Sequence, residues 1–258
     1  MTDILGLVGI FVAGILAGAI NSVAGGGTLI SFPSLVAFGE SPIISNATNT
    51  AALWPGSLSS AIGYRKDTPL QAGLLATLLI PSLIGGILGA WILVSTPPGI
   101  FNIVVPFLVL FATLLFAFRD QITRVLRHGN SNEEYISTGS RTWGFFFQLF
   151  VATYGGYFGA GMGILMLGSL SIMGLRDIHK MNMIKTPLAA LINFTAFVLF
   201  AVKGLVAWDL ALVLCIGAIL GGYVGARSAK HVNARVLQVF VVVIGLVVSA
   251  WLLFKVIH

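Results

Sequence analysis

Charged side chains are scarce in this sequence of 258 residues. Asp, Glu, Lys and Arg together make up 9% of the chain, whereas apolar residues make up 57% and the mean hydropathy is +1.01. Soluble domains carry about 25% charged residues. So little charge excludes an ordinary soluble domain and a nucleic-acid binder, and it indicates a chain that lies in a lipid bilayer.

Acidic residues are missing from the middle of every apolar segment. All 8 Asp and Glu residues fall at segment ends or in the polar stretches between segments. We therefore expect neither a carboxylate proton relay at mid-membrane nor a cation site built on carboxylates. The sequence also has no P-loop, no HExxH motif and no Cys/His cluster. We expect no direct use of ATP, no cofactor, no metal and no catalytic residue, so the protein is not predicted to be an enzyme.

The sequence does contain the same hydrophobic unit twice, offset by 136 residues with almost no gaps. The matching pairs are Ala24/Ala160, Gly25/Gly161, Gly27/Gly163, Leu29/Leu165, Asn46/Asn182, Thr50/Thr186, Gly85/Gly221, Gly86/Gly222, Gly89/Gly225 and Ala90/Ala226. Internal duplication is typical of secondary transporters, whose substrate site lies between the two halves. We therefore expect a transporter with a first transmembrane repeat at residues 1–118 and a second at residues 142–258.

The hydropathy pattern predicts an all-α integral membrane protein with about five segments in each repeat. The expected segments are 4–23, 27–39, 44–64, 70–94 and 99–118, then 142–158, 163–174, 180–201, 206–228 and 234–256. A full crossing needs about 20 residues, so the second segment of each repeat is too short to cross unaided. Each is expected to be a half-helix or one arm of a re-entrant hairpin, and the sequence leaves the choice between these open.

The positive charges predict how the two repeats are oriented. If the second repeat is inverted, one side of the membrane collects Arg65, Lys66, Arg119, Arg124, Arg127, Arg141, Arg176, Lys180, Arg227, Lys230 and Arg235. The other side then holds only Lys203 and Lys255. If the short segments instead return to the side from which they start, after a full crossing by the segment before them, the basic residues scatter over both sides. Cytoplasmic loops are enriched in Lys and Arg, which favours inverted repeats, a cytoplasmic linker at residues 119–141 and both termini outside the cytoplasm.

A glycine run precedes the short segment in each repeat, at residues 24–28 and 159–163. Glycine permits left-handed backbone and close approach, and the first amides of the helix that follows have no intrahelical partner. A helix N-terminus within the membrane attracts anions. The alternative is a tight turn between packed helices, but recurrence in both repeats favours binding.

A polar stripe opens the third segment of each repeat. Asn46, Asn49 and Thr50 share one helical face, and Asn182, Lys185 and Thr186 occupy the equivalent positions. Such groups are costly in hydrocarbon and should face the bundle interior or a wet cavity, where they could donate to anion oxygens. For Lys185 the alternative is snorkelling to the membrane surface. The candidate substrate-binding residues are Asn21, Gly26, Gly27, Thr28, Asn46, Asn49, Thr50, Gly161, Gly163, Asn182, Lys185 and Thr186.

The glycine run carries a family resemblance. The segment "AGGGTLISFPSL" and its degenerate second copy "GAGMGILMLGSL", with "GGILGA" and "GGYVGA" at matching positions, resemble the sulfite exporter TauE/SafE family, also described as 4-toluene sulfonate uptake permeases. The resemblance covers nearly the whole chain. The second copy departs from the pattern at Met162, where the first has Gly26, so the two halves are not expected to bind equally.

This resemblance implies a bacterial inner-membrane protein that moves small sulfur-containing anions such as sulfite, sulfoacetate or other organosulfonates. We expect the anion to bind near the midplane and to be carried by alternating access. An anion leaving a cell with a negative interior gains roughly 2.3 kcal/mol per charge per 100 mV, so an exporter or facilitator is favoured over a proton-coupled importer. The expected partners are the anion and the lipid bilayer, with a homodimer left open. The alternatives are an anion channel and a non-transporting membrane scaffold or assembly factor.

Overall fold

The computed structural model describes residues 4–65, 72–119, 121, 138–175, 177–229 and 234–257, and within these ranges it contains ten helices and no strand. The first half holds α1 (Ile4–Val23), α2 (Thr28–Phe38), α3 (Pro42–Arg65), α4 (Ala72–Ser95) and α5 (Pro98–Ala117). The second half holds α7 (Thr138–Tyr157), α8 (Met162–Ile172), α9 (Ile178–Val202), α10 (Trp208–Ser228) and α11 (Ala234–Ile257). Every predicted segment is a helix, with ends displaced by no more than about one turn, so the prediction of an all-helical chain is confirmed.

Six of these helices are long and apolar enough to cross a membrane: α1, α4, α5, α9, α10 and α11. By contrast, α2 and α8 have 11 residues each. A helix of that length spans about 16 Å, which is roughly half of the hydrocarbon core of a bilayer. The two short helices are therefore half-helices that begin inside the bundle.

Large apolar side chains cover much of the outer surface of the bundle. Exposed members include Ile80, Trp91, Phe107, Leu212 and Val224, which lie on the long helices α4, α5 and α10. Soluble monomers rarely expose apolar surface on this scale. This surface is therefore the one that faces lipid.

Close helix contacts are made through glycine. A Cβ atom on Gly14 of α1 would lie 2.4 Å from the carbonyl oxygen of Leu214 in α10, and one on Gly89 of α4 would lie 2.0 Å from the carbonyl oxygen of Thr153 in α7. No larger residue fits at either position without moving the backbone. Packing between helices in lipid relies on such small residues, because burial of apolar surface gives no driving force there.

The two halves are intertwined. The fourth helix of each half packs against the first and third helices of the other half, so that α4 lies on α7 and α9 while α10 lies on α1 and α3. Helices α3 and α9 pack against each other, and so do α5 and α11. Each of these partnerships is preserved when every helix is replaced by its counterpart in the other half. The bundle therefore has the internal symmetry that the sequence repeat predicts.

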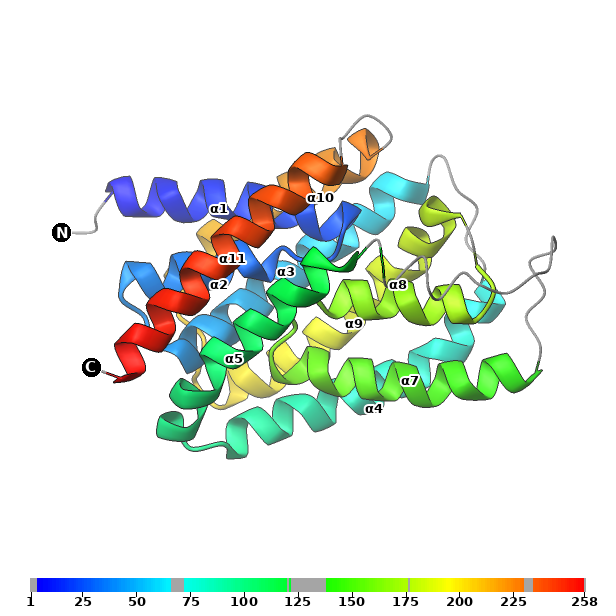
Figure 1. The fold of residues 1–258 in the computed structure, drawn as a ribbon, viewed down its shortest axis with the longest axis horizontal. Helices are drawn as coiled ribbons and strands as arrows, with labels where there is room; N and C mark the ends of the chain where they lie inside the picture. The colour runs from blue at the N-terminus through cyan, green and yellow to red at the C-terminus, as the bar shows by residue number, and fades with distance from the viewer. Residues whose placement is uncertain are drawn as a thin grey trace.

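Both chain ends lie at the same end of the bundle, on the left in Figure 1. The C-terminal ends of α3 and α10 and the start of α11 lie at the opposite end, and these carry Arg65, Arg227 and Arg235. Lys255 belongs to the last turn of α11, at the end that holds the termini. The basic residues Lys66, Arg124, Arg127, Arg176 and Lys230 and most of the linker at 119–141 lie outside the described residues.

Candidate substrate-binding site

Two glycine turns meet in the interior of the bundle. The first turn, residues 24–27, joins α1 to α2, and the second, residues 158–161, joins α7 to α8. Gly25 and Gly161 have left-handed backbone, with φ of 85° and 75°, which an L side chain rarely adopts. A Cβ atom on Gly25 would lie 2.5 Å from the Cα of Gly163, so the turns are in contact. The N-termini of the two half-helices therefore lie beside each other.

The backbone amides at these N-termini are unsatisfied. Among the residues that the structure describes, the N–H groups of Gly26, Gly27 and Thr28 donate to no protein acceptor, and neither do those of Gly161 and Gly163. All five residues are buried. Buried N–H groups nearly always have a partner, and the N-terminal ends of helix dipoles favour negative charge. The two turns thus form a paired set of donors, as the glycine runs predict.

Helix α5 covers both turns. A Cβ atom on Gly26 would lie 2.4 Å from the ring of Phe116, and one on Gly161 would lie 3.4 Å from the Cα of Ala112. Phe116 is fully buried. The first turn is therefore closed by an aromatic ring, and the second by the backbone of α5.

Lys185 reaches the first turn from α9. Its Nζ donates to the carbonyl oxygens of Asn21 and Ser22, at 3.1 Å each, in the last turn of α1. Its side chain is only 1% exposed, so the alternative of snorkelling to the surface is wrong. Within the described part of the chain no carboxylate lies close enough to pair with this ammonium group. The carbonyl dipoles that end α1 face this charge and partly balance it.

The polar stripe of α3 likewise donates to a carbonyl group at the end of α7, in the second half. Asn46 Nδ2 donates to the carbonyl oxygen of Tyr157, at 2.9 Å, in the last turn of α7. Tyr157 is the counterpart of Asn21 in the repeat. Each stripe therefore caps the C-terminal end of the helix that precedes the glycine turn of the opposite half, α1 or α7. One cap is a charged ammonium group and the other is a neutral amide.

The remaining side-chain donors of the stripes are also engaged with protein groups. Asn49 accepts a hydrogen bond from Ser31 of α2, and its Nδ2 donates to Thr28 Oγ1 at 3.3 Å. Thr50 and Thr186 donate to the carbonyl oxygens of Asn46 and Asn182, each at 2.9 Å. The structure brings the predicted residues together, and the donors that it leaves unused include the turn amides and the third N–H of Lys185.

Each stripe also holds an unused acceptor. The Oδ1 atoms of Asn46 and Asn182 are buried and have no hydrogen-bond partner. These two residues occupy the same position in the repeat. Buried polar atoms without a partner are uncommon, which marks both positions as able to accept from a ligand or a water molecule.

Two tyrosines also make hydrogen bonds at the site. Tyr64 Oη donates to the carbonyl oxygen of Ser22 and accepts from Asn182 Nδ2, both at 3.3 Å. Tyr154 Oη donates to the carbonyl oxygen of Ala160 at 2.6 Å and so closes the second turn. The counterparts of these tyrosines are Phe200 and Gly18, so neither is marked by recurrence in the repeat.

Asn21 is the candidate nearest the edge of the site. Its side-chain Nδ2 donates to Ser57 Oγ of α3 at 3.2 Å, and the residue is half-buried. Its carbonyl oxygen accepts a hydrogen bond from Lys185, whereas its side-chain amide donates to Ser57 and not to a ligand beside the turn amides. The asparagine therefore ties the end of α1 to α3.

Duplicated membrane-crossing helices with two half-helices that meet at their N-termini define an integral membrane protein built as transporters are. The chain belongs to the TauE/SafE sulfite exporter family, whose sequence profile matches residues 10–252.

Curated relatives carry transporter names. A probable membrane transporter protein, ORF9, of Sinorhizobium sp is 28% identical over 95% of this chain and 91% of its own length. A probable membrane transporter protein of Haemophilus influenzae is 27% identical over 93% and 92%. The Escherichia coli K12 protein named probable membrane transporter protein YfcA is 27% identical over 95% and 88%. No solved structure matches the chain.

Proposed function

We propose that the protein is a secondary carrier of small sulfur-containing anions such as sulfite, sulfoacetate or other organosulfonates. The observation that carries this proposal is the set of buried, unused amide donors at the two half-helix N-termini, with the buried ammonium group of Lys185 beside the first of them. Such a site favours a compact anion that can accept several hydrogen bonds at once.

Membership of a family named for sulfite export supports the sulfur-containing class. Sulfite and sulfonate groups present three oxygens around one sulfur atom, and backbone amides can donate to all of them without a dedicated side chain. The charge of Lys185 favours an anion over a neutral solute. The site does not discriminate among these anions by any side chain that contacts only one of them.

We further propose that the halves are inverted repeats and that transport proceeds by alternating access. The exchange of packing partners between the halves supports this, and so does the gathering of Arg65, Arg227 and Arg235 at the end opposite to the termini. The turn amides are buried under α5, so an anion reaches them only when the halves shift relative to each other. Rocking of one repeat against the other provides this motion.

The proposed direction is export or facilitated exit. Glu40, Asp177 and Asp209, the acidic residues in the part of the chain that the structure describes, lie between helices or at helix starts and away from the turns. The membrane potential by itself drives an anion outward by roughly 2.3 kcal/mol per charge per 100 mV. The positive-charge bias supports an inner membrane location with both termini outside the cytoplasm.

Purified protein in liposomes tests the function. We expect saturable uptake of at least one of sulfite, thiosulfate, sulfoacetate and an aromatic sulfonate, with protein-free liposomes as the control. Flux that rises linearly with concentration would identify a channel. Neither uptake nor thermal stabilisation by any of the four anions would identify a scaffold and overturn the proposal.

A reporter fused to the C-terminus tests the topology. Activity outside the cytoplasm is expected, because Lys203 and Lys255 are the only basic residues assigned to that side. A cytoplasmic reporter would contradict the proposed orientation.

A further inference from the structure

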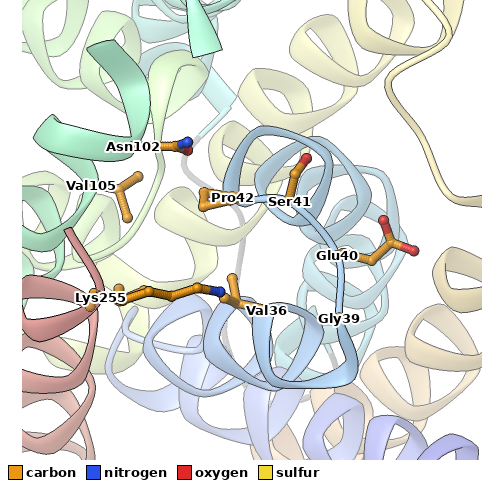
Figure 2. Close-up of a pocket in the computed structure, with 9 residues that line it drawn as sticks. Val36, Gly39, Glu40, Ser41, Pro42, Asn102, Val105 and Lys255 are labelled. Carbon is orange, nitrogen blue, oxygen red and sulfur yellow. The ribbon is translucent and has the colours of Figure 1, made fainter. Parts of the chain in front are cut away.

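A cavity of about 340 Å³ opens at the end of the bundle that holds the termini. It lies where the C-terminal end of α2 and the start of α3 meet the start of α5 and the end of α11. Its polar lining residues are Glu40, Ser41, Asn102 and Lys255. We call it the Lys255 cavity, and Figure 2 shows its lining.

The polar groups of this cavity suit an anion. In Figure 2 the Lys255 side chain extends across the cavity toward Val36, whereas the Glu40 carboxylate points away from it. Lys255 Nζ lies 5.6 Å from the ring centroid of Trp251, which orients the ammonium group without neutralising it. Within the described residues, the Asn102 side chain makes no hydrogen bond to the protein. A positive charge and an unused amide donor, both on exposed residues, thus line one open cavity.

A second cavity of about 480 Å³ lies at the opposite ends of the same two helices, and its lining includes Gln121, Arg235 and Gln238. Gln238 is the counterpart of Asn102 in the repeat. Its Nε2 donates to the carbonyl oxygens of Phe116 and Ala117, at 2.9 Å each. The two cavities thus share one equivalent pair of lining residues, Asn102 and Gln238, and of these two side-chain amides only that of Asn102 is left available.

Helix α5 connects both cavities to the glycine turns. Asn102 and Val105 line the Lys255 cavity, Ala112 lies on the second turn, and Phe116 lies on the first. Ala117 and Gln121 then line the second cavity. Asn102 and Ala112 are separated by about 15 Å along the helix axis. One helix thus runs from a cavity at one end of the bundle, past both sets of amide donors, to a cavity at the other end.

We propose that the Lys255 cavity is a second anion-binding site, which holds a sulfonate or sulfite group at the outer mouth of the carrier. Lys255 supplies the charge, and Asn102 donates a hydrogen bond to the anion. The choice of anion rests on the proposed function, whereas the electrostatic character of the cavity does not. The anion then passes between this site and the turn amides along the surface of α5.

Cysteine labelling tests the site without requiring transport. Ser41→Cys in a Cys215→Ala background places one thiol in the cavity, and its reaction rates with an anionic sulfonatoethyl and a cationic trimethylammonium-ethyl methanethiosulfonate are compared on intact cells. We expect the anionic reagent to be favoured, and Lys255→Gln to lower the anionic-to-cationic rate ratio by roughly fivefold. Lys255→Arg should preserve the ratio. We also expect 4-toluenesulfonate to protect the thiol.

The matched control is Lys203→Gln. It removes the same charge at the same side of the bundle, but Lys203 does not line the cavity. An equal fall in the ratio for both glutamine variants would show a general surface potential and overturn the proposal. So would a failure of 4-toluenesulfonate to protect the thiol. The labelling assay measures no flux, so its result is independent of the uptake assay. Uptake in liposomes without protection of the thiol would overturn the second site alone. Protection of the thiol without uptake would support the second site and overturn the carrier function.

Discussion

The two glycine turns join corresponding helices but are held in different ways. The first turn follows α1, whose terminal carbonyl groups are capped by the ammonium group of Lys185. The second turn follows α7, whose end is capped by the neutral amide of Asn46, and Tyr154 closes the turn itself. Both arrangements satisfy carbonyl groups that would otherwise be buried without partners.

This difference separates a structural requirement from a functional one. An amide suffices to cap a broken helix, since Asn46 does so in the second half. The charge of Lys185 is therefore more than the fold demands at this position, and burying it has a cost in free energy. A buried cation retained at only one of two equivalent turns favours anion binding centred on the first turn.

Folding is expected to depend most strongly on the contact between the two glycine turns. Gly25→Ala should prevent folding, because the new Cβ would lie 2.5 Å from the Cα of Gly163 and φ is 85°. Fluorescence-detected size-exclusion chromatography of the solubilised protein measures the folded fraction. Gly9→Ala is the control, because nothing lies within 4 Å of its new Cβ. A folded Gly25→Ala variant would show that the turns can move apart freely.

Removal of the charge at the first turn should affect transport more than folding. Lys185→Met is expected to lower anion uptake by about a hundredfold, equivalent to ~2.7 kcal/mol. Its thermal stability should change little, because the loss of two hydrogen bonds is offset by the loss of a buried charge. Uptake in liposomes and Tm in detergent are the measurements, with Lys203→Met as the control. Unchanged uptake by Lys185→Met would remove the charge from the site.

The asparagines of the two stripes should differ in their effect on stability. Asn46→Ala leaves the Tyr157 carbonyl oxygen without its 2.9 Å hydrogen bond and should destabilise the protein by about 1–2 kcal/mol. Asn182→Ala removes only a 3.3 Å contact with Tyr64 and should cost about half as much. Comparison of Tm values in the same detergent measures this difference. A larger loss of stability for Asn182→Ala would contradict the assignment of the helix cap to Asn46.

The smallest effect is expected at the hydroxyl group that closes the second turn. Tyr154→Phe removes the 2.6 Å hydrogen bond to the Ala160 carbonyl oxygen and should lower stability by about 0.5 kcal/mol. Tyr157→Phe is the matched control, because the structure gives its hydroxyl group no hydrogen bond. Equal Tm values for the two variants would show that the second turn does not depend on Tyr154.

The helices could be predicted from the sequence because hydropathy in a membrane protein follows the bilayer closely. All ten segments were predicted, and the short lengths of α2 and α8 indicated that neither crosses the membrane unaided. The intertwining of the halves was not predicted. It depends on which helix faces fit each other, such as Gly14 on Leu214 and Gly89 on Thr153, and both halves offer several small-residue faces of the same kind.

The candidate site was predicted in its location but not in its division of roles. Recurrence of glycine and of the Asn and Thr stripe brought attention to residues that do lie together. The sequence could not show that Asn46 and Lys185 reach across to the other half, because hydrogen bonds between segments far apart in the chain leave no local pattern. Tyr64 was missed for the same reason.

The sequence by itself determined that the chain crosses a membrane, that it is duplicated, and that only one copy of the polar stripe carries a charge. These follow from composition and from residue identity at matched positions, which do not depend on packing. The tertiary structure decided that the turn amides remain unused, that Lys185 is buried beside one turn, and that α5 joins the turns to a cavity at each end. These depend on which groups come within hydrogen-bonding distance, and that is set only when the helices pack.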